Sequence, residues 1–480
     1  MSSTGKLIAN NALWKYLELF SVMGIQLLCT TIMARYLTPE DYGILGMVLI
    51  FSALGEVFVN SGFVQTIIRE KNVTRTDYST IFYFNIGISI LLYLFLYFLS
   101  TYIADFYEKP ILVDICKVAF LVLPLNALSI VQMAKLQREL KFKKIFYVSF
   151  FASLISAILA IAIAYFYKNV WALVLQVVMT VLLRDIFLWF TTDFIPELKF
   201  SIKTIITYFK FSRNLLMSGL LGTIFSNIYS LIIGKVYSVS ELGFYSQAIK
   251  INNLASQTTT QVVQTVTFPI LSKLHNEGVD IKDGYRKIIS VTLIIVGFVM
   301  AMLMSCAQDF FELFLGNAIW RTAGVFFLLI GINGILYPLH CINQNILLVK
   351  GDSKTILLLE IFRRCIMILI LLVTIKFSIN VFVFGISIYS VVLLFINLHF
   401  CGKPINYSVK EQLKDCLPIF VRLLLMIVIS YMFSVAFLPQ QILLRFISSI
   451  LICLTLGFLM FRKLQYVQDI VGIFKTYLTK

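Results

Sequence analysis

A stripe of polar side chains follows one face of an apolar segment near the middle of the chain. Its members are Ser246, Lys250, Asn253, Gln257, Gln261 and Gln264, separated by four, three, four, four and three residues. This spacing places all six on one side of an α-helix. Hydroxyl and amide groups donate and accept hydrogen bonds, so the stripe suits a polyhydroxylated ligand in a water-filled cavity. Hydrogen bonding between neighbouring membrane helices is the alternative, and for a stripe of this length we favour the cavity.

A second stripe with helical spacing occurs in a later apolar segment. It consists of Asn333, Tyr337, His340 and Gln344, separated by four, three and four residues. Isolated polar residues of this kind more often bond neighbouring helices to each other than line a cavity. Because polar groups at this helical period suit sugar hydroxyls, we include Asn333 and His340 among the candidate cavity residues, together with Lys250, Asn253, Gln257 and Gln261 from the first stripe.

Cations within apolar segments could bind a phosphate-bearing ligand. Lys250, Arg363 and Arg364 are the candidates, and the planar fork of an arginine matches phosphate oxygens in pairs. Arg363 and Arg364 point about 100° apart on a helix, so at most one faces a cavity squarely. Glu360, one turn earlier, is available to neutralise the other.

Charged residues also occur in the first two apolar segments. Lys15 and Glu18 are three residues apart and can pair on one face of a helix, although a position near a span end also allows Lys15 to extend to the membrane surface. We count Lys15 as a candidate cavity residue. Glu56 lies deep in its segment and is a candidate for ion coupling, since a carboxyl in a low-dielectric site binds a proton more readily. A structural partner for a lysine or arginine is the equally weighted alternative.

The other cations within apolar segments have simpler interpretations. Lys117, Arg422 and Arg445 lie close enough to segment ends to act as surface anchors. Arg184 lies deeper, but the adjacent Asp185 can balance its charge.

These residues must be positioned by membrane helices, because the composition excludes an ordinary soluble domain. The 480 residues are 60% hydrophobic and only 13% charged, whereas soluble domains carry roughly 25% charged residues. Apolar runs recur from end to end, and each is long enough to cross a hydrocarbon core of about 30 Å. A membrane barrel would need short alternating segments instead of continuous runs. The sequence therefore predicts an all-α integral membrane protein.

Fourteen transmembrane helices are predicted. Their approximate ranges are 12–35, 42–66, 79–104, 111–133, 145–167, 170–192, 212–236, 242–269, 287–308, 322–348, 355–376, 380–401, 417–438 and 442–461. With both termini in the cytoplasm, the cytoplasmic loops and tails hold 26 lysines and arginines and the opposite loops hold six. This asymmetry is typical of the positive-inside rule and supports the count of spans. The net charge of +16 is then mainly a topology signal and an attraction to anionic lipid, and no nucleic-acid partner is needed.

The spans divide into two six-helix lobes. Residues 34–45 and 234–245 both contain a cation, a hydroxyl-bearing loop, an acid and a glycine between apolar runs. Such an internal repeat is typical of two-lobe transporters. The predicted order is an N-lobe at 1–192, an amphipathic cytoplasmic linker helix at 193–211, a C-lobe at 212–402, and helices 13 and 14 with a cytoplasmic tail at 403–480. The repeated turns fall on the outward face, where we expect them to hold helix pairs at the rim.

Several chemistries lack their residues. There is no GxxxxGK[ST] loop for nucleotide phosphates and no HExxH or GxSxG motif for hydrolysis. The eight cysteines show no paired spacing, so neither a disulfide framework nor a metal site is expected. We predict no cofactor and no enzymatic activity.

Three segments carry a resemblance to a known family: the start Leu7–Tyr36, the turn Leu37–Gly43 and the segment Leu136–Phe142. They resemble polysaccharide transporters of the Wzx type, within the superfamily that also holds the MATE exporters. The branch serving lipopolysaccharide and exopolysaccharide pathways is the most similar. The two-lobe plan extends the resemblance over the whole chain, although the later half matches more loosely.

The resemblance implies a flippase for undecaprenyl-pyrophosphate-linked oligosaccharides in the bacterial cytoplasmic membrane. It also implies alternating access of two lobes, and a polysaccharide polymerase and a chain-length regulator as partners. A MATE-like drug or metabolite exporter is the alternative transporter, although the extra helix pair speaks against it. A membrane polysaccharide polymerase or acyltransferase is the enzyme alternative, and the short outward loops count against it.

Overall fold

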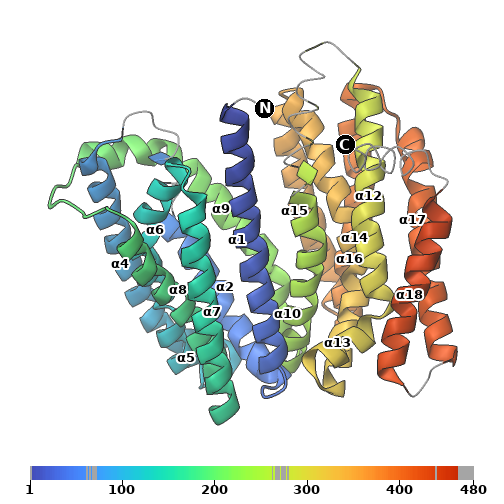
Figure 1. Cartoon of the computed structure of the whole chain (residues 1–480), viewed down its shortest axis with the longest axis horizontal. Coiled ribbons are helices and arrows are strands. Elements are labelled where there is room, and N and C mark those ends of the chain that lie inside the picture. The colour runs from blue at the N-terminus through green and yellow to red at the C-terminus, as the bar shows by residue number, and fades with distance from the viewer. Residues whose placement is uncertain are drawn as a thin grey trace. The chain divides into compact units, whose positions relative to one another are not determined.

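The computed structural model describes residues 3–60, 73–261, 280–437 and 441–462, with a few single residues between these ranges. Across these residues the regular structure is helical, without a strand (Figure 1). The chain forms two compact units, Met1–Gly243 and Phe244–Lys480. Each is described here by itself.

The first unit begins with long helices joined by short turns. These are α1 (Ser3–Met33), α2 (Pro39–Asn60), α4 (Arg75–Tyr107), α5 (Leu112–Ala119), α6 (Val122–Arg138), α7 (Phe142–Tyr167), α8 (Trp171–Thr191) and α9 (Ile202–Val236). The unit ends within α10 (Val239–Asn253).

The second unit continues α10 into a π-helical turn and then a further set of helices. These are the π turn Leu254–Thr258, α12 (Ile281–Ser305), α13 (Ala307–Leu315), a 3₁₀ turn at Ala318–Trp320, α14 (Arg321–Val349), α15 (Ser353–Thr374), α16 (Ile379–Gly402), a 3₁₀ turn at Lys403–Ile405, α17 (Val409–Phe437) and α18 (Ile442–Phe461).

Twelve stretches of the described helices are long and apolar enough to cross a membrane. Each coincides with one of the fourteen predicted spans, which confirms a polytopic helical membrane protein. The other two predicted spans are 242–269 and 355–376. Only part of the first lies within the described residues. The second forms as α15, but its charges at Lys354, Glu360, Arg363 and Arg364 exceed what a plainly apolar span carries.

The fourth span is divided. A proline inside a helix commonly kinks it, but in this span the break lies before Pro124, at Phe120–Leu121 between α5 and α6. Pro124 is the third residue of α6, where a backbone N–H would have no intrahelical partner. The proline is therefore accommodated in the first turn of a new helix.

The predicted linker helix at 193–211 is helical only from Ile202 onward, where it is continuous with the seventh span in α9, and residues 193–201 form no helix. The preceding segment is attached to the start of α4 by hydrogen bonds. The Glu197 backbone N–H donates to Ser79 Oγ at 2.8 Å and the Ser201 N–H donates to Thr80 Oγ1 at 3.1 Å. These two hydrogen bonds hold the linker segment against the N-terminal end of α4, within the first unit.

The two repeated turns contact each other within the first unit. A Cβ atom on Gly43 would lie 1.9 Å from the backbone oxygen of Val239, and one on Gly243 would lie 1.8 Å from that of Pro39. Both turns also start their helices with reciprocal caps: the Thr38 and Ser238 N–H groups donate to Asp41 at 2.8 Å and to Glu241 at 2.9 Å. Glycine in both copies is thus required by a backbone-to-backbone approach.

Ion pairs fasten the last two helices within the second unit. Arg286 of α12 donates twice to Asp415 of α17, at 2.8 and 2.9 Å. Arg445 of α18 is only 7% exposed and pairs with Asp309 of α13. The prediction that Arg445 anchors at the membrane surface is therefore wrong. A carboxylate 136 residues away in the sequence neutralises it inside the protein.

Candidate functional site

Helices α1, α7 and α8 enclose a polar cavity of about 370 Å³ in the first unit. Lys15 and Glu18 of α1 line it and form the predicted pair, with Nζ 2.6 Å from Oε2. Ser149 of α7 donates to the other carboxylate oxygen at 3.0 Å. The Glu18 side chain is thus held on both oxygens and is 14% exposed, whereas that of Lys15 remains 51% exposed. The ammonium group keeps donor capacity toward the cavity.

Arg184 of α8 also lines this cavity and connects it to Glu56. Its guanidinium donates to Asn126 Oδ1, and Asn126 Nδ2 donates to Glu56 Oε1 at 3.1 Å. Arg184 lies 3.9 Å from Asp185 as well. Arg184 is therefore linked to Glu56 of α2 through Asn126 of α6, and it also lies near Asp185 of its own helix α8. A change of charge on Glu56 would alter its hydrogen bond with Asn126 and thereby the bond that Asn126 accepts from Arg184.

The first predicted stripe lies on the partly exposed side of α10 and its continuation. Lys250, Asn253 and Gln257 are all partly exposed, and Gln261 is exposed. The π turn Leu254–Thr258 interrupts the regular helical spacing on which the prediction depended. Gln257 Nε2 nevertheless donates to Asn253 Oδ1 at 2.9 Å. The stripe thus keeps polar groups on an accessible face, partly bonded to one another.

The second predicted stripe is divided between exposed and buried positions. Asn333 is partly exposed, whereas His340 is 8% exposed. The His340 ring bonds Ser390 Oγ at 2.9 Å and Asn397 Nδ2 at 3.0 Å, both on α16. These contacts join α14 to α16, which is the helix-bonding role that the sequence left open as the alternative.

Arg363 and Arg364 of α15 share one carboxylate. Arg363 Nη1 donates to Glu360 Oε1 at 2.7 Å and its Nη2 donates to Asn397 Oδ1 at 3.1 Å. Arg364 Nη2 lies 3.4 Å from Glu360 Oε2. The Arg363 side chain is 11% exposed and that of Arg364 is 34% exposed. Of the two arginines, Arg364 therefore has the more accessible guanidinium.

Some of the candidates are brought together in two groups, each within one unit, and the first stripe belongs to neither. Lys15 shares a cavity with Arg184 and reaches Glu56 through it, whereas His340 is linked to Arg363 by Asn397. Sequence reasoning missed Asn126 and Asn397 because a lone asparagine in an apolar helix carries no periodic signal. It also treated Arg184 as balanced by its neighbour Asp185, although the stronger contact is to Asn126.

The architecture belongs to a known class of membrane transport fold. It is similar to the lipid II flippase MurJ in an inward closed conformation, with a TM-score of 0.70 over 94% of this chain and 99% of that chain at 15% identity. It is also similar to an inward-facing multidrug resistance MATE family transporter of the MOP superfamily, with a TM-score of 0.63 over 82% and 98% at 13% identity. At these identities the likeness concerns the fold.

The family follows from the sequence. The model of the polysaccharide biosynthesis protein family matches residues 32–323, and the chain belongs to that family. It is 25% identical to the teichuronic acid biosynthesis protein TuaB of Bacillus subtilis, over 74% of this chain and 73% of that protein. It is 22% identical to the lipopolysaccharide biosynthesis protein WzxC of Escherichia coli, over 65% of this chain and just under two-thirds, 64%, of WzxC. The predicted resemblance to polysaccharide transporters is confirmed.

Proposed function

We propose that this protein is a flippase that moves undecaprenyl-pyrophosphate-linked oligosaccharide units across the bacterial cytoplasmic membrane for O-antigen or exopolysaccharide synthesis. The main support is the cavity that holds Lys15 and Arg184 among membrane-spanning helices, in a chain of a polysaccharide biosynthesis family. Intramembrane charges are costly and commonly face a substrate path. Two cations beside serine and threonine hydroxyls suit an anionic, polyhydroxylated head group.

The proposed topology has fourteen crossings and cytoplasmic termini. Its organisation is the predicted one, with lobes at 1–192 and 212–402, a linker at 193–211 and two added helices at 403–480. The twelve apolar spans and the excess of cations in alternate loops support it. Alternating access would then expose the head group to each side in turn, while the polyprenyl tail stays in the bilayer.

Substrate contacts are proposed for the accessible candidates: Lys15, Lys250, Asn253, Gln257, Gln261, Asn333 and Arg364. Arg363 and His340 are proposed to support Arg364 and the α14–α16 contact that positions it. For Glu56 we propose ion coupling. Protonation of Glu56 weakens the hydrogen bond that it accepts from Asn126, and Asn126 can then turn away and release the guanidinium of Arg184. A polysaccharide polymerase and a chain-length regulator are the proposed protein partners.

The experiment is translocation of a lipid-pyrophosphate oligosaccharide in proteoliposomes that contain the full-length protein. We expect Arg184→Gln, Lys250→Ala and Arg364→Ala each to lower the rate at least tenfold with normal expression. Arg75→Gln, a substitution at an exposed cation outside the cavity of α1, α7 and α8, is the matched control. Unchanged transport in all three variants would refute the cationic path.

A MATE-like exporter of drugs or metabolites is the second candidate, favoured by the fold likeness to a MATE transporter. Movement of an organic cation by the same proteoliposomes, without movement of the lipid-linked sugar, would establish it instead. Elongation of the sugar chain in this assay would indicate the polymerase alternative.

A further inference from the structure

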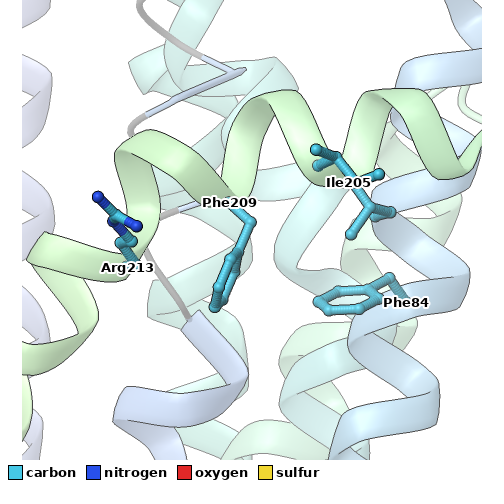
Figure 2. Close-up of a pocket in the computed structure, with 5 residues that line it drawn as sticks. Phe84, Ile205, Phe209 and Arg213 are labelled. Atoms are coloured by element: carbon cyan, nitrogen blue, oxygen red, sulfur yellow. The ribbon is translucent and has the colours of Figure 1, made fainter.

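A separate hollow of about 490 Å³ lies between the first turns of α9 and helix α4 (Figure 2). Phe84 of α4 and Ile205, Ile206 and Phe209 of α9 give it apolar walls. Arg213, one turn further along α9, is the charged residue among the five described residues of the lining. Figure 2 shows the rings of Phe209 and Phe84 on the side where the two helices face each other. The hollow therefore combines an apolar space with one cation at its edge.

Hydrogen bonds hold this part of α9 in place at both ends. Thr204 Oγ1 donates to Asp77 Oδ1 of α4 at 2.8 Å, just before the hollow begins. Ser212 Oγ and Thr66 Oγ1 lie 3.2 Å apart at its other end. Because polar contacts fix the segment on both sides, apolar packing alone does not set its distance from α4. The space beneath it is part of the fold.

The hollow lies within the first three turns of α4, near one end of a helix that is long and apolar enough to cross a membrane. The described part of α4 begins at Arg75, and Phe84 lies about 14 Å further along the helix axis. Ile206 and Phe209 are 67% and 43% exposed. Exposed apolar groups beside a cation, at the end of a membrane span, are typical of a surface that contacts lipid. Among the described residues that line the hollow there is no carboxylate to neutralise Arg213.

We propose that this hollow binds one anionic phospholipid, with the phosphate on Arg213 and an acyl chain between Phe84 and Phe209. The charge selects the lipid: a guanidinium fits a phosphate with a net negative head group, and the exposed Lys203 on the same helix adds to the attraction. The bound lipid would brace the linker segment against α4. This site is separate from the proposed transport cavity and does not depend on which substrate that cavity takes.

The test uses the full-length protein with Ile206→Trp as a reporter, because a tryptophan at this exposed position reports contact with brominated acyl chains. The protein is reconstituted in phosphatidylcholine vesicles that contain brominated phosphatidylglycerol or brominated phosphatidylcholine. Subtracting the wild-type signal removes the four native tryptophans. Phe209→Trp serves as a second reporter if the first variant folds poorly.

We expect a preference of about fivefold for phosphatidylglycerol, as one cation near an anionic lipid provides. Arg213→Gln should remove this preference, and Arg75→Gln, at an exposed cation on α4 outside the hollow, should keep it. Equal quenching by both lipids in the reporter protein would overturn the proposal. So would equal losses in the two arginine variants, or displacement of phosphatidylglycerol by a trace of polyprenyl pyrophosphate, which would assign the hollow to the substrate tail.

Discussion

Replacing Gly43 with alanine should be among the most damaging single-methyl changes in the first unit. The added Cβ would lie 1.9 Å from the Val239 backbone oxygen, 2.8 Å from its backbone carbon and 2.8 Å from its side chain. A side chain could rotate away, but the carbonyl belongs to the second repeated turn, which the cap between Ser238 and Glu241 holds at the start of α10. The two turns would have to separate.

The size of the effect follows from the contact distance. Ordinary contacts between carbon and its neighbours lie near 3.5 Å, so the turns must separate by roughly 1.5 Å. Overpacking of this kind costs about 1–3 kcal/mol, and a backbone obstacle places Gly43→Ala near the upper end. For a unit of this size, such a loss lowers the melting temperature by roughly 5–10 °C. Gly243→Ala should behave alike, since its Cβ would lie 1.8 Å from the Pro39 oxygen.

The assay is thermal unfolding of the purified protein in detergent, followed by loss of the monodisperse peak. Gly222→Ala in α9 is the matched control, because a Cβ there meets nothing within 4 Å. Since alanine is about 0.5–1 kcal/mol better than glycine inside a helix, this control should be neutral or slightly stabilising. The double variant Gly43→Ala/Gly243→Ala should lose less than the two single losses together, because both methyl groups open the same gap.

The reasoning would be refuted if the Gly43→Ala and Gly222→Ala proteins had the same melting temperature. Strict additivity in the double variant would contradict the shared contact. A loss of transport without any loss of thermal stability would show that the glycines act in the moving protein and are not required for folding.

Two further predictions concern ion pairs. Arg445→Met should destabilise the second unit by about 3–5 kcal/mol, because it leaves Asp309 buried without its closest cation. Adding Asp309→Leu should recover most of that loss in the same melting assay. Equal melting temperatures of the single and double variants would contradict this prediction. The hydrogen bond and charge of Lys235 hold the pKa of the Glu108 carboxyl below its ordinary value of 4.5. The pair therefore stabilises the folded protein at pH values above 4.5, and this contribution is lost as the pH falls through the lowered pKa. The difference in melting temperature between wild type and Glu108→Gln should therefore be constant near neutral pH and disappear in acid. A difference that grows in acid would contradict this prediction.

Local signals in the sequence were sufficient for the helices themselves. A membrane helix satisfies its own backbone hydrogen bonds, so a long apolar run predicts a helix whatever its neighbours are. The pair of Lys15 and Glu18, three residues apart, was predictable for the same reason. The first repeated turn could be placed from Thr38 and Asp41, since a cap involves residues only three apart.

Lateral packing was not predictable, because hydropathy does not show which helices are neighbours. Asn126 bonds a glutamate 70 residues away, and Arg445 bonds an aspartate 136 residues away. The same limit explains why His340, placed in a cavity by its spacing, is instead bonded to Ser390 and Asn397 of α16. The π turn at Leu254–Thr258 is also a tertiary outcome, since a helix-forming stretch gives no local sign of it.

The sequence alone determined that this protein is a polytopic helical membrane protein of the polysaccharide transporter type, with a repeated turn in each half. The physical reason is that insertion and helix formation depend on local composition. Only the tertiary structure decided that Gly43 and Gly243 lie against each other's turns, that Arg184 links a cavity to Glu56, and that α9 lies over a hollow edged by Arg213. Those facts depend on contacts between helices that are distant in the chain, and such contacts are selected by shape and charge complementarity across the whole bundle.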